Sequence, residues 1–137
     1  MAERMGMLLR LPPVQPRSRL AHEAARFAAG QGCLEAFHEE VFRAFFQRGE
    51  DIGQTDVLVA IGEGVGLDGV ALRQALISRE FEAGVVADEE LANRLGLHAV
   101  PAYMVERRRV VTGLQSAEEL KWLVFGTGLS SATLAGK

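Results

Sequence analysis

The sequence predicts an α-rich α/β fold, in which a series of amphipathic helices is followed by one small β-hairpin. Apolar residues recur at helical spacing over most of residues 19–95. Two short runs typical of strands follow at 102–105 and 109–112. Between these regions, Gly96 can take the positive φ that ends a helix, and Pro101 forces the residue before it into an extended conformation.

The composition is that of an ordinary globular domain. The chain has 137 residues, of which 48% are hydrophobic and 24% charged, with a formal net charge of -3. Arginine is dispersed among acidic residues, so we expect no nucleic-acid partner. There is no apolar run of about 18 residues and no signal-peptide pattern, so we expect no membrane association and a cytoplasmic location.

Polar side chains that can cap helices divide the first part of the chain into helical segments. The expected N-caps are Ser18, Thr55, Asp68, Ser78 and Ser116, the last within a capping box that Glu119 completes. The helix after Ser78 is expected to run from about Arg79 to Leu95. Gly126 is expected to end the last helix. We therefore expect a single domain over residues 1–126 and a flexible tail over 127–137.

The helix expected from Leu34 to about Gln47 has the strongest apolar stripe. Its members are Leu34, Phe37, Val41 and Phe45, widened by Phe42 and Phe46. We interpret this stripe as a core face, with a small-molecule pocket as the alternative. We expect a structural role for His22 and a solvated helix face for His38.

Four stretches carry a resemblance to a known family. They are 16–22 (PRSRLAH), 42–53 (FRAFFQRGEDIG), 95–101 (LGLHAVP) and 111–116 (VTGLQS). They resemble the second half of a DsbA-family thioredoxin-like protein, and among its branches they resemble the FrnE-like dithiol-disulfide isomerases. The 2-hydroxychromene-2-carboxylate isomerases, or kappa-class glutathione transferases, are related. The resemblance implies a helical insertion followed by the C-terminal hairpin and helix of a thioredoxin-like fold, with no counterpart of the N-terminal βαβ unit and its Cys-x-x-Cys motif.

The resemblance also implies a substrate-binding loop. Val100 and Pro101 match the loop that, in relatives, holds a cis proline opposite the catalytic cysteines and offers backbone groups to an extended substrate. We therefore expect Val100, Pro101 and the nearby His98 to bind a disulfide-bearing peptide or protein. For His98, the alternative is an ordinary surface position.

Cys33 is the one cysteine of the chain. A single cysteine can form neither a Cys-x-x-Cys pair nor a cysteine-based zinc site. A thiolate that attacks a disulfide also needs a second thiol to resolve the mixed disulfide. We therefore expect no catalytic residue, no metal and no cofactor. Near a helix start Cys33 could be a reactive thiol, and the alternative is a small apolar filler.

An isolated two-stranded hairpin is marginally stable and leaves open edges. We therefore expect Ala102–Val105 to pair with, or pack against, a second copy in a homodimer or a chain that supplies the missing strands.

Three functions remain open at this point. The first is a DsbA/FrnE-like thiol-disulfide oxidoreductase family domain that is inactive alone. The second is a non-catalytic, dimeric peptide- or protein-binding module. The third is a glutathione-binding fragment of the kappa-class type.

Overall fold

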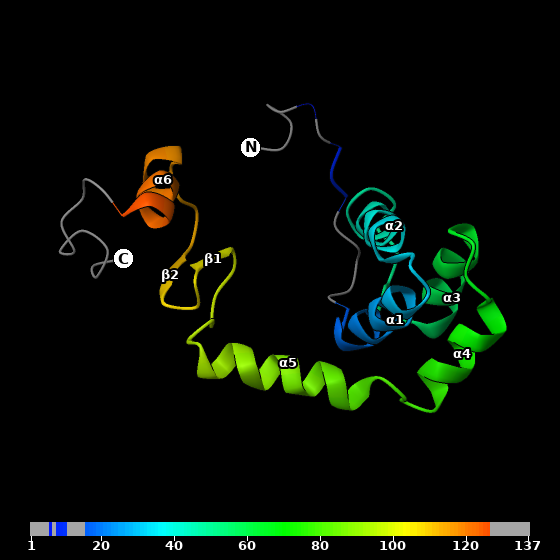
Figure 1. The fold of residues 1–137 in the computed structure, drawn as a ribbon. Coiled ribbons are helices and arrows are strands. Elements are labelled where there is room, and N and C mark those ends of the chain that lie inside the picture. The colour runs from blue at the N-terminus through cyan, green and yellow to red at the C-terminus, as the bar shows by residue number, and fades with distance from the viewer. Residues whose placement is uncertain (1–5, 7, 11–15, 127–137) are drawn as a thin grey trace. The chain divides into compact units, whose positions relative to one another are not determined.

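The computed structural model describes residues 6, 8–10 and 16–126 (Figure 1). The expected tail, 127–137, lies outside the described residues. The elements are α1 (Arg19–Gly30), α2 (Leu34–Phe46), α3 (Thr55–Gly64), α4 (Gly69–Ile77), α5 (Glu82–Arg94), β1 (Ala102–Val105), β2 (Arg109–Thr112) and α6 (Ala117–Phe125). The chain divides into two compact units, Met1–Ala87 and Asp88–Lys137, and each is described by itself. A single domain over 1–126 therefore stays a prediction.

The first unit is built on one apolar core shared by α1, α2, α3 and α4. Phe37, Leu58 and Leu72 are fully buried at its centre. The alanine stripe of α1 faces this core and lets the neighbouring helices approach closely. The side chains that complete the cluster are Ala21, Ala24, Ala25, Ala28, Val41, Ala44, Ile52, Val59, Ile61, Leu67 and Leu76.

The start of α5 is tied to α1 within the same unit. The rings of Phe27 and Phe81 meet edge to face with centroids 6.3 Å apart. The Nη2 atom of Arg26 donates a hydrogen bond to the carbonyl oxygen of Gly84 at 3.2 Å. Val85 is the buried residue of α5.

Two expected caps are confirmed and three need correction. The side chain of Asp68 accepts from the backbone nitrogens of Val70 at 2.9 Å and Ala71 at 3.1 Å, as predicted. Ser18 occupies the N-cap position of α1 but makes no side-chain cap bond. Thr55 is the first residue of α3, after an extended Gln54.

The expectation that Ser78 starts the fifth helix is wrong, because Ser78 ends α4. Arg79 follows with a φ of 57°, a left-handed conformation that interrupts the helical path. The backbone nitrogen of Glu80 donates to the carbonyl oxygen of Ala75 at 3.1 Å, which closes the end of α4 in the manner of a Schellman motif. The next helix therefore begins three residues later than predicted, at Glu82.

The second unit holds the predicted hairpin. β1 and β2 pair antiparallel, with Ala102 opposite Thr112 and Val105 opposite Arg109. The connection has positive φ at Glu106 (53°) and Arg107 (56°). The backbone nitrogen of Arg108 donates to the carbonyl oxygen of Val105 at 3.2 Å, so the turn resembles type I′.

α6 begins with the predicted capping box, in which Ser116 and Glu119 bond each other's backbone nitrogens. It ends at Gly126, whose φ of 68° is left-handed. The Nη1 atom of Arg109 on β2 donates to the carbonyl oxygen of Leu123 at 3.1 Å and so ties the hairpin to α6. In the described part of this unit, Leu123 is the one buried apolar side chain.

Candidate functional sites

The first candidate site is the loop that joins α5 to β1 in the second unit. Gly96 has a φ of 74°. The backbone nitrogen of Leu97 donates to the carbonyl oxygen of Ala92 at 2.9 Å, which closes the end of α5. The peptide bond between Val100 and Pro101 is cis. The helix end expected from Gly96 is therefore confirmed.

The structure brings the three expected substrate-binding residues, Val100, Pro101 and His98, into this one loop. All three are exposed, and Val100 is 92% exposed. The carbonyl oxygen of Pro101 accepts a hydrogen bond from the backbone nitrogen of Gly113 at 2.8 Å. Within the described residues, no hydrogen bond engages the backbone of Val100. The loop is thus fixed at Pro101 and accessible at Val100.

A groove that sequence reasoning missed lies in the same unit. It encloses about 740 Å³. Its lining is mostly polar and includes a run of backbone from the end of β2 into the segment before α6. The lining residues are Leu95, Gly96, Ala99, Val110, Val111, Thr112, Gly113, Leu114, Gln115 and Glu119. The Nε2 atom of Gln115 donates to the carbonyl oxygens of Thr112 at 3.0 Å and Gly113 at 3.3 Å, which holds this segment in place.

Cys33 belongs to the first unit. It is the N-cap residue of α2 and makes no side-chain cap bond. Its half-buried thiol packs against the apolar core and lies 3.8 Å from the carbonyl oxygen of Gln31. This environment is that of a small filler residue, and a reactive thiol at this position stays a prediction.

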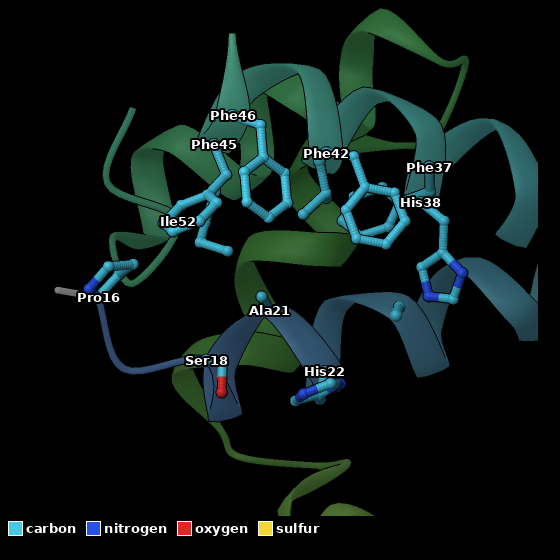
Figure 2. A pocket seen from close by; sticks show the side chains of 12 residues that line it. Pro16, Ser18, Ala21, His22, Phe37, His38, Phe42, Phe45, Phe46 and Ile52 are labelled. Atoms are coloured by element: carbon cyan, nitrogen blue, oxygen red, sulfur yellow. The ribbon is translucent and has the colours of Figure 1, made fainter. Parts of the chain in front are cut away.

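The second candidate site is a cavity of about 380 Å³ between α1 and α2 in the first unit (Figure 2). Its lining residues are Pro16, Ser18, Ala21, His22, Ala25, Phe37, His38, Val41, Phe42, Phe45, Phe46 and Ile52. The expectation that the whole phenylalanine stripe is core is therefore wrong. Phe37 is buried, but Phe42 is 59% exposed, because no described element covers its side of α2. His22 and His38, expected to have structural and solvated roles, both line the cavity.

A buried acidic residue was also missed. Glu23 on α1 is 1% exposed, and its Oε2 atom lies 3.1 Å from the Nη2 atom of Arg79. Burial raises the pKa of Glu23, and Glu82 raises it further, whereas Arg79 and Arg19 lower it. Its spacing from Leu20 and Phe27, three residues before and four after, was the signal that could have placed it near the core.

Two classes of site find no support in the part of the chain that the structure describes. No cluster of three His, Cys, Asp or Glu residues there could hold a metal ion. No helix there has the length and apolarity needed to span a membrane.

Comparison with known proteins agrees with this fold. The family model of the DSBA-like thioredoxin domain matches residues 1–124. The uncharacterized protein YwbO of Bacillus subtilis is 37% identical over 84 residues, which are 60% of this chain and 42% of YwbO. The crystal structure of a probable DsbA oxidoreductase from Streptomyces coelicolor matches with a TM-score of 0.76 and 26% identity, over 94% of this chain and 58% of that protein. The chain thus spans roughly half the length of these relatives.

Proposed function

The chain belongs to the family of DSBA-like thioredoxin domains, and from that premise we propose that it is the substrate-holding part of a FrnE-like thiol-disulfide oxidoreductase. Its substrate is an extended, disulfide-bearing peptide or protein at Val100 and Pro101. The cysteine pair that exchanges the disulfide comes from outside these 137 residues.

The exposed Val100–Pro101 loop at the start of β1 is the observation that carries this proposal. Val100 is 92% exposed. Its backbone N–H and C=O face no partner among the described residues, so they are available to an incoming extended chain. Main-chain hydrogen bonds of this kind give affinity without requiring a particular substrate sequence. The bond from Gly113 to Pro101 keeps the loop in place while the substrate binds.

The chemistry explains why the chain alone is inactive in this proposal. A thiolate attacks one sulfur of the substrate disulfide, forms a mixed disulfide and releases the other substrate sulfur as a thiolate. A second thiol must then attack the sulfur of the first cysteine in the mixed disulfide, which releases the substrate sulfur still bound to it. The chain has one cysteine, so it cannot complete both steps as a dithiol. Addition of the chain should therefore leave the rate of insulin reduction by dithiothreitol unchanged, and clear acceleration would contradict the proposal.

The small size of the hairpin is the basis for proposing a protein partner. The described sheet has two strands. We propose that a second copy, or a polypeptide that supplies further strands, pairs with or packs on Ala102–Val105. A homodimer predicts a concentration-dependent mass in sedimentation. A stable monomer at micromolar concentration that also binds no strand-supplying polypeptide would count against both forms of this proposal.

Substrate binding can be tested by NMR titration with an oxidised, disulfide-bonded peptide. We expect the largest amide shifts at Val100 and Ala102, and a smaller response after His98→Ala. The amide of Phe37, in the core of the first unit, is the control. Shifts that spare residues 98–102 would remove the substrate-holding role.

The single cysteine also favours a second candidate, a non-catalytic peptide-binding module that uses the same loop. It predicts that a disulfide-free peptide of the same sequence binds as tightly as the oxidised one.

The third candidate, a glutathione-binding fragment of the kappa-class type, predicts instead that the chain is retained on immobilised glutathione and released by free glutathione.

A further inference from the structure

The cavity between α1 and α2 has aromatic walls on one side and a small-residue floor on the other. α2 directs the rings of Phe42, Phe45 and Phe46 toward α1 (Figure 2). Opposite them α1 presents Ala21 and Ala25, whose side chains end at Cβ and leave the space open. The rings are held in fixed relation: those of Phe45 and Phe46 are edge to face with centroids 4.7 Å apart. The arrangement favours a flat ring system inserted between the two helices.

The described polar side chains that line this cavity include two histidines and no acidic residue. Among the described residues that line it, the polar side chains are Ser18, His22 and His38, and none is a carboxylate. An imidazole is neutral or cationic near neutral pH and can donate a hydrogen bond from a ring nitrogen in either state. His38 stands beside the aromatic wall, with its ring centroid 6.3 Å from that of Phe42. An anionic or hydrogen-bond-accepting group therefore fits this rim, whereas a cation would find no carboxylate among these described lining residues.

Size and exposure are consistent with a small ligand. A cavity of about 380 Å³ lies within the range of roughly 300 to 1,000 Å³ that small-molecule sites occupy. Phe42 is 59% exposed, so a bound ring would remove apolar surface from water at a position where no described element does so.

We propose that this cavity is a binding site for a flat aromatic molecule that carries one anionic group. The rings of α2 and the alanines of α1 enclose the aromatic part, and His22 and His38 bind the anionic group. This site lies in the first unit, and its existence does not depend on the proposed role of the Val100–Pro101 loop in the second.

Two probes of equal aromatic size and opposite charge test the proposal on the full chain. They are naphthalene-2-carboxylate and 2-naphthylmethylammonium, titrated by calorimetry and by NMR. We expect the carboxylate to bind about tenfold more tightly than the ammonium, or better, with amide shifts in α1 and α2. Absence of carboxylate binding, equal affinity for both probes, or shifts confined to Val110–Gln115 would overturn the proposal.

Two pairs of variants distinguish the contribution of the phenylalanine rings to ligand binding from that of the imidazoles. Phe42→Ala should weaken carboxylate binding by about tenfold, whereas Phe125→Ala, at an exposed phenylalanine of the second unit, should leave it unchanged. His38→Phe keeps a ring beside Phe42 and should reduce the preference for the carboxylate, because His22 alone then remains to bind the anionic group. His98→Phe, at the histidine outside the cavity, is its control. Phe42 and His38 are exposed, so unchanged circular dichroism is expected for both; a folded His38→Phe variant that keeps the full preference would contradict the role of His38.

Discussion

The two units of this chain differ in how much of their own core they contain. In the first unit, Phe37, Leu58 and Leu72 are fully buried within one continuous apolar cluster. In the described part of the second unit, Leu123 alone among apolar side chains is buried, while Val100 and Phe125 are 92% and 72% exposed. Hydrophobic burial is the main favourable term in folding. We therefore expect the first unit to supply its own stability and the second to be less stable by itself.

This difference bears on function, because the exposed loop and the open hairpin belong to the unit with little core. A two-stranded hairpin needs additional strands or helices to become independently stable. The partner that we propose would add such cover to the hairpin. The following predictions test the contrast between the two units, starting with the largest expected effect.

Removal of a core ring from the first unit should have the largest effect. Phe37→Ala leaves a cavity in a fully buried site and should lower the free energy of unfolding by about 3 to 5 kcal/mol. Phe42→Ala, on the same helix but 59% exposed, is the matched control and should cost far less. Urea denaturation followed by far-UV circular dichroism measures both. Equal losses for the two variants would mean that the first unit has no distinct core at Phe37.

Hydrogen exchange compares the two units through amides with similar hydrogen bonds. The backbone nitrogen of Phe37 donates to the carbonyl oxygen of Cys33 at 3.0 Å, and that of Gly113 to the carbonyl oxygen of Pro101 at 2.8 Å. We expect Gly113 to exchange much faster, because local opening costs little where few apolar groups are buried.

Conditions that favour binding of the proposed partner should change the exchange rates of these two amides differently. Either a higher concentration of the chain or addition of a strand-supplying polypeptide should slow the exchange of Gly113 and leave Phe37 unchanged. Equal protection of both amides in the monomer would show that the second unit is already complete.

The hairpin and the backbone of the loop before it could be predicted because local residue chemistry determines them. Gly96 permits the positive φ that ends a helix, Pro101 restricts the backbone around it, and the run from Arg109 to Thr112 is rich in β-branched residues. Asp68 and Ser116 likewise identify helix starts through side-chain oxygens that lie within reach of the first amides.

The failures arise where neighbours distant in the sequence determine the outcome. Arg79 adopts a positive φ, although arginine does not favour it, so no local signal marked the end of α4. The periodicity of α2 identified its apolar stripe but not what covers each position. Phe42 was therefore expected in the core and instead lines a cavity. The buried Glu23 pairs with Arg79, which is more than fifty residues away in the sequence.

Helix caps test whether the same local interaction has the same consequence in each unit. Asp68→Ala and Ser116→Ala each remove side-chain bonds to first-turn amides and should destabilise their helices by about 1 kcal/mol. For Asp68→Ala we expect the loss in the unfolding of the first unit. For Ser116→Ala we expect faster hydrogen exchange restricted to α6.

Ser18→Ala is the control, since Ser18 makes no cap bond, and it should change stability by no more than a few tenths of a kcal/mol. A loss of first-unit stability in Ser116→Ala would show instead that the two units unfold together.

The smallest expected effect concerns Glu23, the one buried acid in the described core. Burial raises the pKa of its carboxyl above 4.5, against the opposing attraction of Arg79. A raised pKa means that the folded state favours the protonated form, so this group stabilises the fold at low pH. That contribution is lost as the pH rises from about 4.5 through the folded-state pKa. Glu23→Gln keeps the shape and cannot ionise, so its free energy of unfolding should rise relative to the original chain between about pH 4 and about pH 7. If Arg79 instead overcomes the cost of burial, the variant will become the less stable of the two, and the gap will widen with increasing pH.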